Sequence, residues 1–234
     1  MEAMMTAPFW IAVGQIILID ILLGGDNAVV IALACRGLPP KQRKMGIIYG
    51  TAGAIILRVI LIAFALALLA VPYLKIIGGI LLLWIGVKLL VPHDDDAHAN
   101  INPSDKLWGA VKTIIVADLV MSVDNVIAIA GAAQGAGDHQ LGLVIFGLLV
   151  SIPIIVAGSQ IVLKLMDRFP MIITFGGMLL GWIAGQMAYT DPVLRGIVPA
   201  DKTFEYAAAV TGALLVFAVG KAIQARRRTA PTSA

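Results

Sequence analysis

The sequence predicts an all-α membrane protein: seven transmembrane helices, arranged as two inverted three-helix repeats plus one extra C-terminal helix. Three observations support this prediction. The 234-residue chain is 60% hydrophobic and only 13% charged, whereas about a quarter of the residues in a soluble domain are charged. It contains a series of long apolar stretches. Finally, the two halves of the chain resemble each other at a constant offset of 98 residues.

The predicted spans are continuous apolar runs, of about the 20 residues needed to cross a hydrocarbon core about 30 Å thick. Because hydrophobic residues follow one another instead of alternating with polar ones, the runs indicate helices. They occupy residues 9–35, 46–70, 72–92, 107–133, 140–166, 170–189 and 204–224.

The internal similarity divides the single transmembrane domain, residues 1–234, into matching parts. Pro72 matches Pro170, and Gly78-Gly79 match Gly176-Gly177, where we expect close helix packing. Three spans is an odd number, so the second copy should be inverted, as in many secondary transporters. An ancient duplication without a transport function would leave the same pattern. The parts are repeat 1 at about 9–92, a cytoplasmic loop at 93–106, repeat 2 at about 107–189, a seventh helix at 204–224 and a basic tail at 225–234.

Basic residues predict the orientation of the chain. Of the seventeen Lys and Arg residues, thirteen lie in segments assigned to one side and three in segments assigned to the other. The positive-inside rule then places the N-terminus outside and the C-terminus in the cytoplasm, in a bacterial plasma (inner) membrane. The basic tail is expected to contact anionic lipid headgroups, and nothing in the sequence indicates binding to nucleic acid.

Two copies of an Asp-x₅-Asp-Asn motif lie inside the first and fourth spans. A carboxylate at the centre of a membrane helix costs about 2.5–3.5 kcal/mol, so such residues are expected to be functional. Gly24-Gly25 precede the first Asp-Asn pair, and we expect the helix to unwind there; the alternative is an unbroken helix that is tilted in the membrane. The second copy has Ser122-Val123 instead, a pair that favours a break less than two glycines do. The motif residues are Asp20, Asp26, Asn27, Asp118, Asp124 and Asn125.

These six side chains are the candidate metal ligands. Arg58 is the one basic residue placed deep in a predicted span, and it cannot neutralise four carboxylates. The sequence therefore favours a cation held by hard oxygen ligands, such as Mn²⁺, Mg²⁺ or Ca²⁺. Met121 is either a soft ligand that favours Mn²⁺ or a packing residue. Arg58 is either a counterion or gating residue at the metal site, or one half of a structural ion pair. In a purely structural alternative, Asp26 and Asp124 cap half-helices and Asp20 pairs with Arg58.

The paired Asp-Asn motifs, with the Gly-Gly-x₄-Trp-Ile pattern of the third and sixth spans, resemble the TerC family of integral membrane proteins. The resemblance covers residues 9–224 and is nearest to the YjbE-type branch, whose genes are often associated with a manganese riboswitch. It implies a seven-helix protein of the LysE transporter superfamily that acts in Mn²⁺ efflux, with the six motif residues at the family's metal site. It also implies a role in supplying metal to secreted metalloenzymes, and an association with tellurium resistance.

The function predicted from these patterns is export of a divalent cation, Mn²⁺ first, by alternating access and with proton exchange on an aspartate. Alternatives are an accessory membrane protein that delivers metal to exported metalloenzymes, a tellurium-resistance component, or an exporter of small amino acids, which four acids and one Arg fit poorly. No nucleophile–base pair or cofactor motif is apparent, so we expect neither enzymatic activity nor a cofactor. The expected partners are the metal ion, the lipid bilayer, and either further copies of the chain or metal-dependent export machinery.

Overall fold

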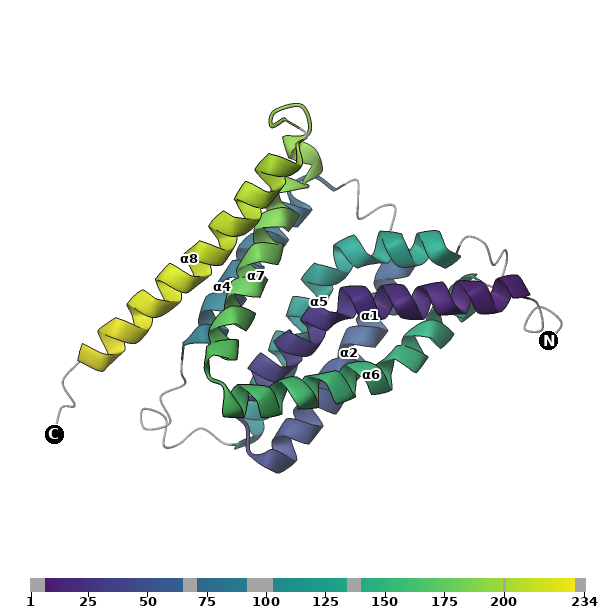
Figure 1. The fold of residues 1–234 in the computed structure, drawn as a ribbon. Helices are drawn as coiled ribbons and strands as arrows, with labels where there is room; N and C mark the ends of the chain where they lie inside the picture. The colour runs from purple at the N-terminus through teal and green to yellow at the C-terminus, as the bar shows by residue number, and fades with distance from the viewer. Residues whose placement is uncertain (1–6, 65–70, 92–102, 134–139, 200, 230–234) are drawn as a thin grey trace. The chain divides into compact units, whose positions relative to one another are not determined.

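A computed structural model of the chain describes residues 7–64, 71–91, 103–133, 140–199 and 201–229. These residues are almost entirely helical and form no β-strand (Figure 1). The predicted all-α fold is therefore confirmed. The helices are α1 (Ala7–Cys35), α2 (Pro40–Ala63), α4 (Leu74–Leu90), α5 (Pro103–Ala133), α6 (Gln140–Arg168), α7 (Met171–Tyr189) and α8 (Lys202–Thr229), with a short 3-10 helix η3 (Pro192–Leu194).

Each predicted span overlaps one of these helices, and residues 65–70 at the end of the second predicted span lie outside the described residues. Four of them, α2, α6, α7 and α8, are long and apolar enough within the described residues to cross a membrane. α4 is a shorter apolar helix of 17 residues. The chain is thus a multi-pass helical membrane protein, while the inverted orientation of the repeats stays a prediction.

The observed helix ends differ from the predicted ones where polar residues join an apolar core. α2 begins at Pro40 instead of residue 46. Proline fits the first turn of a helix, because the backbone N–H that it lacks would have no partner within the helix there. α5 begins at Pro103 and so takes in the end of the predicted loop 93–106, most of which lies outside the described residues. α8 continues to Thr229, so the arginines of the predicted basic tail extend the last helix.

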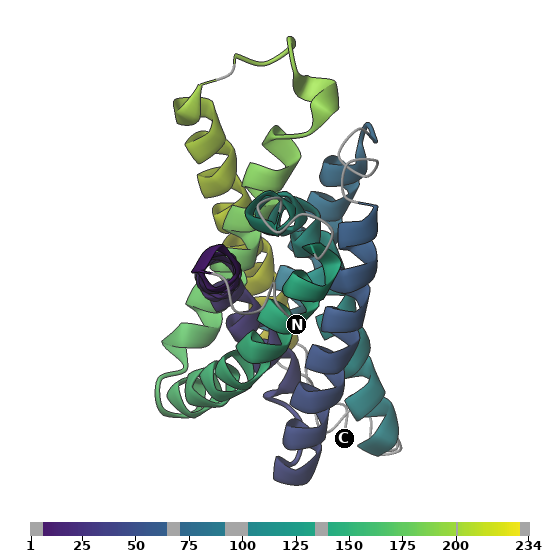
Figure 2. The same cartoon turned by 90° about the vertical axis from the view of Figure 1, so that its right-hand side faces the viewer.

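The chain forms two compact units. Unit 1 comprises Met1–Val71 and Leu107–Lys164, and unit 2 comprises Pro72–Lys106 and Leu165–Ala234. Unit 1 therefore contains α1, α2 and nearly all of α5 and α6, which lie together in two perpendicular views (Figures 1 and 2). Unit 2 contains α4, α7 and α8. Each unit thus combines corresponding segments of both predicted repeats.

Unit 2 is held together by close backbone contacts at glycines. The predicted packing role of the glycine pairs is confirmed in α4 and α7, where all four glycines are buried. A Cβ atom added to Gly79 would lie 2.8 Å from the backbone oxygen of Ala184. A Cβ on Gly181 would collide with the backbone oxygen of Gly212 in α8, and the reverse holds as well. Small residues let membrane helices approach this closely.

Asp191 fastens the start of α4 to the loop between α7 and α8. Its carboxylate, in a residue that is 1% exposed, accepts hydrogen bonds from the backbone N–H groups of Tyr73, Lys75, Ile76 and Val193 at 2.9–3.2 Å. Burial acts to raise the pKa of Asp191, but these four donors outweigh it and hold the pKa below its ordinary value of 3.8. Tyr73, with a left-handed φ of 64°, is fixed by one of these bonds. The carboxylate is therefore a structural cap for α4.

In unit 1, α1 and α5 carry the two Asp-x₅-Asp-Asn motifs. The predicted unwinding at Gly24-Gly25 is wrong, because α1 is helical without interruption from Ala7 to Cys35. The ribbons of α1 and α5 instead change direction along their length (Figure 1). In hydrocarbon every backbone polar group needs an internal partner, so a bend that keeps the helical hydrogen bonds costs less than an unwound segment.

Candidate metal-binding site

A buried cluster of three polar side chains links α2 to α5. An Arg58 Nη2 donor forms an ion pair with Oδ1 of Asp118, and the Nε of Arg58 donates to Oγ of Ser122 at 3.1 Å. The Ser122 hydroxyl in turn donates to Oδ2 of Asp118 at 3.0 Å. Arg58 is 3% exposed, Asp118 6% and Ser122 0%. Each of the three therefore contacts the other two away from solvent.

Beside this cluster, unit 1 contains a partly open cavity of about 20 Å³. Four helices line it, and the lining residues of α1, α2 and α5 recur at helical spacing, so each of these three helices presents one face to the cavity, while α6 contributes Ile155. α2 contributes positions i, i+3, i+4 and i+7 counted from Thr51, and α1 contributes positions i, i+3 and i+4 counted from Asn27. The lining residues are Asn27, Val30, Ile31, Thr51, Ala54, Ile55, Arg58, Ile114, Asp118 and Ile155.

Two side chains that line the cavity hold polar atoms without a hydrogen-bond partner. Asn27 is 4% exposed and Thr51 3%. Neither the amide oxygen and nitrogen of Asn27 nor the hydroxyl of Thr51 forms a hydrogen bond. A buried polar group left unpaired costs about 1–3 kcal/mol, and such groups are rare in native structures. Their concentration on one small cavity indicates that its occupant supplies the missing partner.

The size and chemistry of the cavity limit what this occupant can be. A volume of about 20 Å³ accommodates about one water-sized species. Asn27 and Thr51 present neutral oxygens, and Asp118 adds a carboxylate. Amide, hydroxyl and carboxylate oxygens are ligands that suit Mg²⁺, Ca²⁺ and Mn²⁺. A single cation that has shed most of its hydration shell fits this space and these donors.

The structure brings some of the predicted site residues together and leaves others apart. Asn27, Arg58 and Asp118 all line the cavity. Asp26 is half-buried, its Oδ1 accepts the backbone N–H of Asn27 at 2.8 Å, and it lies within electrostatic range of Arg58 and Asp118. Asn125 is half-buried on α5. Neither Asp26 nor Asn125 belongs to the cavity lining as far as the structure describes it.

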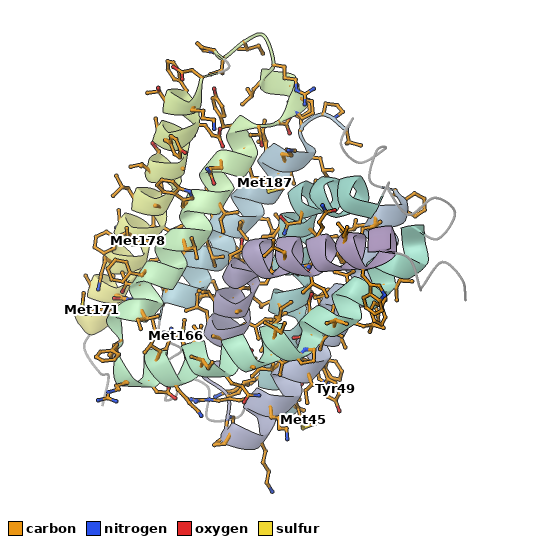
Figure 3. All side chains as sticks on the ribbon, turned by 45° about the vertical axis from the view of Figure 1, so that its right-hand side comes forward. Met45, Tyr49, Met166, Met171, Met178 and Met187 are labelled. Atoms are coloured by element: carbon orange, nitrogen blue, oxygen red, sulfur yellow. The ribbon has the colours of Figure 1, made fainter. Side chains whose placement is uncertain are left out.

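Methionine is not among the residues that line the cavity. Met121 is buried at 4% exposure, in keeping with a packing role. In unit 2, Met171, Met178 and Met187 are spread along α7 (Figure 3). Those three thioethers therefore share no common binding point.

The other two predicted aspartates, Asp20 and Asp124, have helical backbones, but their side chains lie outside the described part of the chain. Among the side chains that the structure does describe, no group of three or more His, Cys, Asp or Glu residues gathers. The alternative pairing of Arg58 with Asp20 falls on a side chain that is not described, and Arg58 pairs with Asp118.

Sequence reasoning did not single out Thr51 as a site residue, and considered Ser122 only as a possible helix break. Both have a signal in the sequence. Thr51 precedes Arg58 by seven residues and Ser122 follows Asp118 by four, so each shares a helix face with a charged residue in a predicted span. Polar residues at i+4 or i+7 from a membrane-embedded charge are therefore candidates for the same site.

The fold and the cavity define a multi-pass helical membrane protein with a polar site buried inside a helix bundle. The integral membrane protein TerC family model matches residues 5–228. The chain therefore belongs to the TerC family.

Three relatives illustrate how far the similarity extends. The chain is 44% identical over 187 residues to the uncharacterized membrane protein YjbE of Bacillus subtilis, an alignment that covers 80% of this chain and 83% of that one. It is 27% identical over 187 residues to YceF of the same organism, covering 76% and 71%. It is 28% identical over 192 residues to YegH of Escherichia coli, covering 74% of this chain and 35% of the longer relative. No solved structure matches the chain.

Proposed function

We propose that the protein transports a divalent metal cation, Mn²⁺ first, out of the cell by alternating access. The observation that carries this proposal is the cavity of unit 1, where the unpartnered oxygens of Asn27 and Thr51 lie beside the carboxylate of Asp118. Membership of the TerC family supports a membrane transport function. The choice of Mn²⁺ rests on the resemblance described above, because the oxygen donors suit Mg²⁺ and Ca²⁺ as well.

The charges around the cavity favour a cation over an anion. The guanidinium of Arg58 is already paired with Asp118, so it is not available to bind an anionic substrate without leaving a buried carboxylate unpaired. The carboxyl group of Asp26 also lies within electrostatic range of Arg58 and Asp118. A small amino acid would also need more room than a cavity of about 20 Å³ provides. The site in this form suits a small, positively charged species.

The direct test uses the purified full-length chain reconstituted in liposomes, with fluxes of Mn²⁺, Mg²⁺, Ca²⁺ and Zn²⁺ measured separately. We expect Mn²⁺ flux from the protein alone, and loss of that flux in Asp118→Asn, which keeps the shape of the side chain but removes its charge. Asp105→Asn is the matched control, because Asp105 is exposed in the first turn of α5. If the wild-type protein moves none of the four ions, the proposal is wrong.

Exchange of protons for the metal is part of the proposal. An interior pH dye in the same liposomes should report proton movement opposite to Mn²⁺ movement, and an imposed pH gradient should drive Mn²⁺ uptake. Mn²⁺ flux that neither moves protons nor responds to the gradient would remove this part of the proposal and leave the transport function in place.

A further inference from the structure

The ion pair between Arg58 and Asp118 occupies the carboxylate that a metal ion would need. Oδ1 of Asp118 accepts from Arg58, and Oδ2 accepts from Ser122 at 3.0 Å. A cation that enters the cavity therefore finds the unpartnered oxygens of Asn27 and Thr51, but meets a carboxylate already held on both oxygens. Each oxygen of Asp118 keeps a further lone pair, so a metal ion could bind it, but that ion would then lie beside the guanidinium of Arg58. We therefore expect ligation of a metal by Asp118 to loosen its contact with Arg58.

Arg58 also lines the cavity itself. Its positive charge opposes an entering cation, and in a buried site such repulsion is only weakly screened. The metal and the guanidinium therefore compete for one carboxylate. When one of them is bound to Asp118, the other is driven away.

We propose that Arg58 is an exchangeable internal cation. It neutralises Asp118 when the site is empty, and the transported divalent ion displaces it when the site is loaded. This inference rests on the proposed transport function and assigns one step of it to a residue. In the empty protein Arg58 lets the bundle change conformation without a bare carboxylate at membrane depth. In the loaded protein the metal ion neutralises Asp118 instead.

The sequence repeat does not duplicate Arg58. At the offset of 98 residues that relates the two copies, Asp118 corresponds to Asp20, while Arg58 corresponds to Val156. The second copy of the motif thus has a basic residue opposite its first aspartate, and the first copy has none at the matching position. Exchange of Arg58 for the metal would therefore give the two motifs different roles.

Two transport measurements on reconstituted full-length protein separate this role from a purely structural one. Net efflux of Mn²⁺ into metal-free buffer requires the empty protein to change conformation. Exchange of radioactive Mn²⁺ against unlabelled Mn²⁺ requires only the loaded protein to do so. In Arg58→Gln we expect net efflux to fall about tenfold or more while exchange stays within about threefold of wild type, because a buried carboxylate without its partner is strongly disfavoured. The concentration of Mn²⁺ that half-saturates exchange should fall, because the competing charge is gone.

Two further variants complete the experiment. Arg195→Gln is the matched control, because Arg195 is exposed in the loop before α8, and both rates should equal those of wild type. Arg58→Lys keeps a mobile positive charge but loses the bidentate guanidinium group. Because that charge can still neutralise Asp118 in the empty protein, the ratio of net efflux to exchange should stay near that of wild type. If Arg58→Gln does not fold, Arg58→Lys decides: a preserved ratio with both rates near those of wild type supports the inference, and a collapsed ratio or an equal loss of both rates overturns it.

The possible failures are distinguishable. Absence of both fluxes in the wild-type protein overturns the transport function and this inference together. Normal net efflux in folded Arg58→Gln, or equal loss of net efflux and exchange, overturns the inference alone and makes the Arg58–Asp118 pair a structural link between α2 and α5.

Discussion

The replacement Thr51→Val tests the cavity most simply, because it exchanges a hydroxyl for a methyl group of nearly the same shape. Thr51 is 3% exposed and its hydroxyl forms no hydrogen bond. An unpaired buried polar group costs about 1–3 kcal/mol. Thr51→Val should therefore raise the free energy of unfolding by up to that amount, and about 2–4 °C per kcal/mol is expected in the Tm of a chain of this size.

The same change should weaken ion binding. Interaction of a polar group with a charge contributes about 1.5–3 kcal/mol, so the half-saturating Mn²⁺ concentration should rise about 10- to 150-fold. Thermal unfolding in detergent and flux in liposomes measure the two effects on one preparation. Thr113→Val is the matched control: the Thr113 hydroxyl already donates to the backbone oxygen of Gly109 at 2.8 Å, so transport should be unchanged and stability should not increase. A less stable Thr51→Val protein with normal Mn²⁺ affinity would refute the reasoning.

The remaining predictions concern both units. Asn27→Leu should raise the Tm and abolish Mn²⁺ flux, since both polar atoms of the side chain are buried without partners; a drop in Tm would contradict this. Gly212→Ala should destabilise unit 2 by about 1–3 kcal/mol in detergent unfolding, because its Cβ would collide with the backbone oxygen of Gly181. Since the pKa of Asp191 is lowered by folding, its stabilising effect should be complete above the ordinary carboxyl pKa of 3.8 and be lost as the pH falls through the lower folded-state value. Asp191→Asn should therefore lower the Tm at neutral pH but have little effect in strong acid, whereas the exposed Asp201→Asn should have a smaller effect at neutral pH.

The fold was predictable because membrane helices depend on local composition. Each apolar run of the sequence became a helix, and the glycine pairs of α4 and α7 pack closely as expected. The helix ends were less predictable, since α2, α5 and α8 extend through polar residues that a hydropathy pattern excludes. The cap formed by Asp191 was not predicted, because its four donors come from segments more than one hundred residues away as well as from its own turn.

The candidate site could be predicted only in part. A carboxylate in an apolar helix is visible in a sequence, and this identified Asp118 and Asn27. Which partner it meets depends on how helices pack. The pairing of Arg58 with Asp118, and the position of Thr51 beside them, follow from the packing of α2 against α5. The expected break at Gly24-Gly25 was wrong because the preference of glycine for irregular backbone is outweighed, inside a membrane, by the need to keep helical hydrogen bonds.

The location of the bound ion tests the central claim most directly. Crystals of the full-length protein grown with Mn²⁺ would allow anomalous difference density to be measured at the manganese absorption edge. The account predicts one peak in the cavity of unit 1, within ligand distance of the side-chain oxygens of Asn27 and Thr51 and next to Asp118, and no such peak in crystals of Asp118→Asn. A manganese peak away from these residues, in protein that transports Mn²⁺, would contradict it.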